Sequence, residues 1–377
     1  MAFRMKTDRI VLVAASLLCG VALLASSVCS GANTQVVDGV YVLGKVDSLL
    51  PARALQNRNV DGVALRVAWD TLEPSPGKFN WSLVDRQIEA AKASGKKVSL
   101  TVGAGYRTPQ WVYAAGAKRF DFVWGQPWGA PMCSSQSIPI PWDPVFLSKW
   151  GGFVRELGRR YDRERTVSLV KITGMNFATE ETMLPRFREK AVSRGAYKCR
   201  TGDEVSRWKM AGYTREKVKS AWRSMADVFA SAFPDKKLAI ITVHLGFPPI
   251  DDSGNVIPGS EADSEATRAL VAEGEERYGE RFIIVNDGLS AFWDPQPGIE
   301  AGRRAALGLQ MLFPVTNDPL CKMNRRRKPC DPRVVLRSAI DRGLAAGARF
   351  MEVYVVDVLN PSLQDVLAYA HRSLTRE

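Results

Sequence analysis

Short apolar runs alternate with longer amphipathic segments over most of the chain. The apolar runs have the length of β-strands, and several are nearly continuous, as parallel strands buried on both faces require. They occupy positions 39–44, 62–69, 97–104, 167–174, 237–244, 281–288, 305–312 and 349–356. Between them, apolar residues three and four apart predict helices, most clearly at 81–94, 143–161, 215–233 and 332–347.

Repeated strand–helix units of this kind predict an α/β protein with a (β/α)8 TIM-barrel fold, in a single domain that spans 31–377. A doubly wound open sheet is the structural alternative, but the chain has no glycine-rich phosphate loop to support it. In a barrel, functional residues gather on the loops that follow the strands. These loops are therefore where the chemistry of this protein is expected.

The N-terminal segment differs from the rest of the chain. Basic residues precede an apolar run at 10–24, and the small residues of ASSVCSGA follow it. This order predicts a signal peptide at 1–30, cleaved after Ser30 or Ala32, and hence a secreted or periplasmic protein. The run is shorter than the roughly 20 residues of a membrane span, although an uncleaved anchor is the alternative. No later segment predicts a membrane span.

Four cysteines follow the signal peptide, and an even number in an oxidising compartment predicts disulfides. They allow three pairings. Cys321 and Cys330 bracket a short loop and form the natural local pair, which leaves Cys133 with Cys199. A metal site is the rival interpretation, but the chain has no CxxC spacing and its two histidines lie far from the cysteines in sequence. The sequence therefore predicts neither a metal nor another cofactor.

The chain is basic and otherwise of ordinary globular composition. Its net charge of +12 falls to +10 once the signal peptide, with three basic residues and one acidic residue, is removed. Such a charge favours anionic partners, and export makes nucleic acid the weakest of these. The run Arg325, Arg326, Arg327 and Lys328 is either a solvated loop or a contact for an anionic polysaccharide. The oligomeric state is not indicated.

Three motifs resemble glycoside hydrolases of clan A, especially families 42 and 5. They are TLEPSPGKFNW at 71–81, within a strand–helix unit at 62–100, then YRTPQWV at 106–112 and PIPWDPVFLSKWGGFVRELGRRYDR at 139–163. The resemblance extends over roughly 38–365 and does not assign an exact family. It implies a (β/α)8 barrel that cleaves O-glycosidic bonds of an oligo- or polysaccharide.

In these enzymes the loop after the fourth strand carries the general acid/base glutamate, which here implies Glu181 or Glu180. Glycosidic cleavage needs one carboxylic acid to protonate the leaving oxygen and a second carboxylate as nucleophile or base. The clan pattern has Asn immediately before the acid, whereas Asn176 lies four residues before Glu180. Glu181 is preferred because the apolar Met183 and Leu184 that follow it are suited to anchoring the loop.

The second carboxylate departs from the resemblance. The clan places a glutamate at the end of the seventh strand, where this chain has Gln310, and an amide is neither a nucleophile nor a base. Glu352 in the eighth strand is the substitute that we predict, with Asp357 next, because a carboxylate in so apolar a strand needs a partner or a purpose. The alternative for Glu352 is a buried ion pair with a residue such as Arg66.

Further residues at or near the strand ends are candidates for substrate binding. Sugar rings present apolar faces, so aromatic side chains with hydrogen-bonding neighbours are expected in the cleft. The predicted set is Arg66, Trp69, Tyr106, Trp111, Asn176, His244, Asp287, Gln310, Tyr354 and Asp357. Trp124, Trp128 and Trp293 are further candidate platforms, although core packing is the ordinary role of a tryptophan, and Glu73 is assigned to the TLEP turn.

Two other functions compete with a glycoside hydrolase. A non-catalytic carbohydrate-binding barrel that lost its nucleophile is favoured by Gln310. An envelope structural or interaction protein would explain the basic surface but not the aromatic residues near the strand ends. A glycan panel scored for both binding and cleavage separates the glycoside hydrolase from the non-catalytic carbohydrate-binding barrel.

Overall fold

The computed structural model describes residues 37–126, 129–186, 188–296, 298–299, 303–328 and 330–375. The predicted signal peptide at 1–30 and Trp128 lie outside the described residues. Within these ranges no helix combines the length and apolar character needed to cross a membrane.

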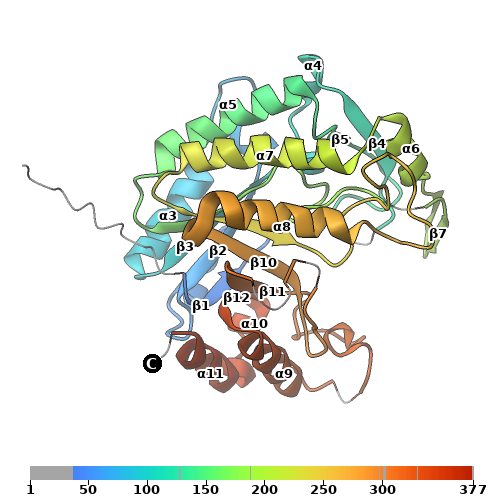
Figure 1. Ribbon diagram of the computed structural model, residues 1–377. Helices are drawn as coiled ribbons and strands as arrows, with labels where there is room; N and C mark the ends of the chain where they lie inside the picture. The colour runs from blue at the N-terminus through green and yellow to red at the C-terminus, as the bar shows by residue number, and fades with distance from the viewer. Residues whose placement is uncertain are drawn as a thin grey trace, which may run out of the picture. The chain divides into compact units, whose positions relative to one another are not determined.

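Eight parallel strands close into a barrel in the order β1-β2-β3-β6-β9-β10-β11-β12, with β12 pairing back onto β1 (Figure 1). The barrel strands are β1 Gly39–Leu43, β2 Gly62–Ala68, β3 Lys97–Gly103, β6 Val167–Lys171, β9 Lys237–Thr242, β10 Phe282–Leu289, β11 Ala306–Met311 and β12 Ala348–Tyr354. Each overlaps one of the apolar runs, and most end slightly earlier than the run does. The predicted (β/α)8 barrel is confirmed.

Amphipathic helices cover the outside of the barrel. The longer ones are α3 Ser82–Ala93, α5 Pro144–Tyr161, α7 Arg215–Ala232, α8 Ser264–Tyr278, α9 Pro332–Ala345 and α11 Gln364–Thr375. In Figure 1, α5, α7 and α8 lie next to one another, and α9 lies beside α11. Local sequence sets where they begin: Asp143 and Asp331 each accept hydrogen bonds from backbone N–H groups of the first turn and are each followed by a proline.

Shorter helices connect these elements. They are α1 Ala52–Leu55, α2 Trp69–Leu72, α4 Gln110–Ala114, α6 Glu204–Met210 and α10 Val355–Val358, with 3-10 turns at Gly105–Arg107, Gly279–Arg281, Lys322–Asn324 and Pro361–Leu363. The short helices α2, α4 and α10 all lie in segments that directly follow barrel strands.

The barrel interior has an apolar layer below a charged one. Tyr41, Leu169, Ile241, Val285 and Phe350 belong to the buried apolar cluster inside the barrel. Two residues further along their strands, Lys171 and Glu352 form an ion pair in which the lysine Nζ lies 2.7 Å from Oε1 and 2.9 Å from Oε2 of the carboxylate. Neither side chain has any exposed surface. This pair separates the apolar layer from the carboxyl-terminal ends of the strands.

Two disulfides secure additions to the barrel. The hairpin of β4 Arg119–Val123 and β5 Ser135–Pro139 is joined by Cys133–Cys199 to the hairpin of β7 Ala191–Arg194 and β8 Tyr197–Arg200. Cys321–Cys330 closes the loop after β11. Both predicted pairings are confirmed, and both bonds lie on segments that follow barrel strands.

Removing the long-range disulfide is expected to cost more stability than removing the local one. The separations are 66 residues for Cys133–Cys199 and 9 for Cys321–Cys330. Chain entropy predicts losses of about 4.4 and about 2.6 kcal/mol respectively, because the longer loop gains more freedom when the unfolded chain is released. Urea unfolding of two double variants, Cys133→Ser with Cys199→Ser and Cys321→Ser with Cys330→Ser, measures which loss of stability is larger. Equal losses would show that native-state contacts, rather than loop length, decide the effect.

Candidate active site

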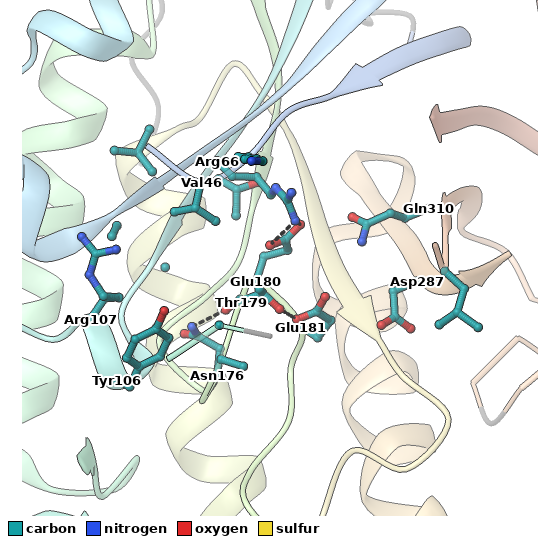
Figure 2. A pocket seen from close by; sticks show the side chains of 18 of the residues that line it. Val46, Arg66, Tyr106, Arg107, Asn176, Thr179, Glu180, Glu181, Asp287 and Gln310 are labelled. Carbon is teal, nitrogen blue, oxygen red and sulfur yellow. Dashed lines mark hydrogen bonds and ion pairs between the residues drawn. The ribbon is translucent and has the colours of Figure 1, made fainter. Parts of the chain in front are cut away.

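A cavity of about 780 Å³ opens at the carboxyl-terminal ends of the barrel strands. Its wall is built from β2, β3, β10, β11, β12 and the loop after β6. Many of the residues predicted from the sequence meet here, as Figure 2 shows for the labelled side chains. The predicted residues in the wall are Arg66, Tyr106, Asn176, Glu180, Glu181, Asp287, Gln310 and Tyr354.

The loop after β6 is folded so that it delivers two adjacent glutamates to the cavity. Gly174 has a φ of 109°, and a Cβ at this position would lie 2.6 Å from the indole nitrogen of Trp150, so the turn requires glycine. Asn176 then closes the loop: its Oδ1 accepts from Gly174 N–H at 3.1 Å, and its Nδ2 donates to the Thr179 carbonyl at 2.5 Å. Asn176 therefore holds the loop in shape besides lining the cavity.

Backbone hydrogen bonds tie the far end of this loop to the neighbouring strand. Thr182 N–H donates to the carbonyl of Ile241 at the end of β9, and Leu184 N–H donates to that of Gly246, each at 2.8 Å. Leu184 is also fully buried. The apolar anchor that was predicted beside Glu181 is thus present, and it holds the two glutamates in place.

Glu180 is held as an ion pair by Arg66 of β2. The Nη1 atom of Arg66 lies 3.1 Å from Oε1 and 3.3 Å from Oε2 of the carboxylate, and the same guanidinium donates through Nη2 to the carbonyl of Gly44. Both residues line the cavity, although little of either side chain is exposed. The planar guanidinium thus fixes the position and direction of the Glu180 carboxylate.

Glu181 has a different environment from its neighbour. Burial and the nearby charge of Glu180 raise the pKa of Glu181 to about 7, while a hydrogen bond donated by the Thr179 hydroxyl opposes the rise. In Figure 2 its carboxyl group points away from Arg66 and toward Asp287. These surroundings favour a proton on Glu181 near neutral pH, as an acid catalyst requires.

Asp287 of β10 completes a facing pair with Glu181. Burial, followed by the charges of Glu181 and Glu180, raises the pKa of Asp287 well above its ordinary value. Because the charge of Glu181 helps to raise the pKa of Asp287, the two carboxyl groups interact, and a proton bound between them belongs to the pair rather than to one residue. The cavity thus contains a carboxyl pair that retains a proton at a pH where isolated carboxylates are ionised.

Glu352 and Asp357, the two predicted candidates for the second carboxylate, lie outside the cavity wall. Glu352 is fully buried against Lys171, so the ion-pair alternative holds, with Lys171 rather than Arg66 as the partner. Asp357 is also fully buried and accepts hydrogen bonds from the N–H groups of Val315 at 3.0 Å and Thr316 at 2.7 Å. It anchors the loop after β11, and the position predicted for it as a substrate contact is corrected.

Most of the predicted sugar platforms are core residues. Trp69 is fully buried and donates to the Glu73 carboxylate at 2.9 Å, and Trp111 donates to the Glu73 carbonyl at 3.0 Å. Glu73 thus belongs to the turn, as predicted. Trp124 is buried against Tyr106, with ring centroids 5.2 Å apart, and Tyr106 alone of these aromatic residues lines the cavity. Tryptophans in loops after strands turned inward because their large apolar surface is buried more favourably than exposed.

A second hollow of about 520 Å³ adjoins the cavity, and the two share Asp287 and Leu312 as wall residues. His244 is exposed and lines this hollow rather than the main cavity. Trp293 also lines it, although the tryptophan is largely buried and donates to the Asn286 side chain at 2.9 Å.

Several wall residues were missed by sequence reasoning. Lys45, Arg107, Arg194, Lys322 and Phe313 line the cavity, and of these only Arg107 lies in a motif, YRTPQWV. Position shortly after a barrel strand would have suggested Lys45, Arg107 and Phe313, whereas Arg194 and Lys322 lie further along, on the disulfide-tied segments. Among the residues that the structure describes, no three His, Cys, Asp or Glu side chains are grouped so that they could hold a metal ion.

The chain is a (β/α)8 barrel protein with acidic residues at the carboxyl-terminal ends of its strands, where enzymes of this fold have their active sites. The model of glycoside hydrolase family 42, described as beta-galactosidase, matches residues 51–189, from α1 through the two glutamates. No curated protein matches the chain. The predicted resemblance to (β/α)8 glycoside hydrolases is confirmed by this match and by solved structures, without assigning an exact family.

Two solved structures illustrate the likeness. The catalytic domain of a beta-amylase from Paenibacillus polymyxa aligns with a TM-score of 0.55 at 9% identity, covering 90% of this chain and 99% of that one. A cold-adapted beta-galactosidase from Rahnella sp. R3 aligns with a TM-score of 0.51 at 9% identity, covering 91% of this chain and 58% of that one. At such identities the similarity is one of fold.

Proposed function

We propose that the protein is a glycoside hydrolase that binds a saccharide in the barrel cavity and cleaves an O-glycosidic bond. The observation that carries this proposal is a pair of facing carboxyl groups in the cavity: Glu181, whose pKa is raised to about 7, and Asp287, whose pKa is raised by burial and by the charge of Glu181. A proton held by one of them leaves the other ionised. Glycosidic cleavage needs a protonated carboxyl group beside an ionised one. The partial match to a glycoside hydrolase family supports the same function.

In the proposed mechanism, Glu181 protonates the oxygen of the leaving sugar. The resemblance places the proton donor on the loop after the fourth barrel strand, which is the loop that holds Glu181. Asp287, whose side chain faces Glu181 from β10, is the second carboxylate: while Glu181 holds the proton of the pair, Asp287 is ionised and attacks the sugar or activates water. It replaces Glu352 in this role, because Glu352 lies outside the cavity wall. Arg66 holds Glu180 in an ion pair, directed away from the reacting pair.

Activity toward saccharides with poor leaving groups is expected to fall as the pH rises through about 7. The pKa of Glu181 is raised to about 7, so its acidic form predominates below that value and is lost above it. The pH profile of kcat/KM measures this alkaline limb. The limb should be absent when Glu181→Gln is assayed on an activated aryl glycoside, which leaves without protonation. An alkaline limb that persists unchanged in that variant would assign the limb to another group.

A non-catalytic carbohydrate-binding barrel is the second candidate, and Gln310 favours it. This amide lies near the end of β11 and lines the cavity, in register with Glu352 on β12. A panel of oligosaccharides, scored for binding and for cleavage, separates the two functions. Cleavage by the wild type and by the surface control Glu276→Gln, but not by Glu181→Gln, supports the hydrolase. Binding by all three without cleavage supports the binding protein.

A further inference from the structure

Cationic side chains surround the mouth of the cavity. Lys45 follows β1, Arg194 ends β7 and Lys322 lies in the loop after β11, and all three are exposed and line the cavity. Among the described residues, none of these three forms an ion pair. Arg66 and Arg107, the other two cations of the wall, are neutralised by Glu180 and by Asp47 with Asp70. The mouth thus presents positive charge that no described acidic residue neutralises.

The two disulfides hold the segments that supply two of these cations. Arg194 belongs to the hairpin that Cys133–Cys199 ties down, and Lys322 directly follows Cys321, which is bonded to Cys330. Lys322 is further positioned by Phe313, with its Nζ 4.6 Å from the ring centroid. Long, exposed basic side chains are ordinarily mobile, so the fixed backbone lowers the entropic cost of directing them at one ligand.

The positive surface continues into the second hollow. Arg325 lines that hollow and lies over the ring of Phe292, with its Cζ 4.8 Å from the centroid. The same disulfide-closed loop therefore supplies Lys322 to the cavity and Arg325 to the second hollow. Of the predicted basic run, Arg325 is the member that reaches either hollow. Arg326, Arg327 and Lys328 are exposed and lie outside both walls.

We propose that the saccharide bound in this cavity is anionic, carrying carboxylate or sulfate groups on the sugar units that lie at the mouth. This inference rests on the proposed function, which is the reason to expect a saccharide in the cavity. The ligand's charge must lie at the mouth, because Glu180, Glu181 and Asp287 would repel an anion at the floor. A single exposed ion pair contributes little, but three cations converging on one concave surface focus their field on the ligand. A neutral sugar would form no ion pair with these three cations.

The test compares oligosaccharides of equal length that differ in charge. Oligogalacturonate, a sulfated galacto-oligosaccharide and a neutral galacto-oligosaccharide are titrated calorimetrically into Glu181→Gln, so that cleavage does not deplete them. Two variants are built on that background. The cavity variant reverses Lys45, Arg194 and Lys322 to Glu. The control variant reverses Arg53, Lys78 and Arg327, which are exposed, lie outside both hollows and change the net charge equally.

We expect an anionic oligosaccharide to bind at least about tenfold more tightly than the neutral one, and the cavity variant to lose that preference while the control variant keeps it. Whether carboxylate or sulfate binds more tightly identifies the charged group. Equal affinities for charged and neutral ligands would overturn the inference, as would a preference that survives the cavity variant or is lost equally in the control. If the protein binds an anionic oligosaccharide that the wild type does not cleave, the proposed hydrolase function fails and the proposal of an anionic ligand stands. No binding of any glycan would overturn both.

Discussion

Replacing Glu181 with Gln is expected to lower kcat on saccharides with poor leaving groups by about 10²- to 10⁴-fold, the range for loss of a general acid. The amide has nearly the same shape but no proton to transfer, so binding should remain close to that of the wild type. Steady-state kinetics together with calorimetric titration separate the two effects. Glu276→Gln, on the exposed surface of α8, is the matched control and should leave both quantities unchanged.

The leaving group distinguishes the roles of the facing carboxyl groups. An activated aryl glycoside needs no protonation, so Glu181→Gln should retain much of its activity on that substrate if Glu181 is the acid. Asp287→Asn should lose activity on both kinds of substrate, because the attacking carboxylate or base is needed in either case. The reverse pattern would exchange the two roles. Full activity of both variants on both substrates would remove the pair from the mechanism.

Breaking the ion pair inside the barrel is expected to have a large effect on stability. Glu352→Gln leaves the buried Lys171 without a counter-charge, which should lower the free energy of unfolding by about 3–5 kcal/mol. Urea unfolding measures this loss. Replacing both residues with apolar side chains of similar volume, as in Lys171→Met with Glu352→Leu, should recover most of it, because the desolvation cost of both charges is then removed.

Two comparisons make this second prediction specific. Asp341→Asn breaks the exposed pair with Arg337 on α9 and should cost less than about 1 kcal/mol. At a temperature where it is folded, Glu352→Gln should also keep its activity per folded molecule, because Glu352 lies outside the cavity wall. A loss of activity comparable with that of Glu181→Gln would restore the catalytic role that the sequence suggested for Glu352.

The sequence was most informative about elements whose pattern is local. Each barrel strand is an apolar run of limited length, and each long helix has its own periodicity, so the fold follows from segments read one at a time. The pairing of Cys321 with Cys330 followed from their short separation, and the other pair followed by elimination. The loop after β6 was also recognisable, because the strand ends abruptly at polar and acidic residues.

It was less informative about the surroundings of individual side chains. Trp69 and Glu352 illustrate the difficulty: each lies near the end of a barrel strand, where a wall position and a core position differ only in the direction of the side chain. Trp69 turned toward α5, where its ring packs against Trp150 with centroids 4.9 Å apart. Glu352 turned into the barrel toward a lysine that is 181 residues away in sequence.

By itself, therefore, the sequence determined the barrel, its disulfides and the loop that brings Glu180 and Glu181 to the cavity, because hydrophobic periodicity and chain separation are properties of the chain alone. Only the tertiary structure decided that Lys171 neutralises Glu352, that Asp287 faces Glu181 and that Lys45, Arg194 and Lys322 converge at the cavity mouth. The physical reason is that charge and desolvation act through space. Closing the barrel brings together side chains from strands that are distant in sequence, and these neighbours set which carboxyl group holds a proton and which is neutralised.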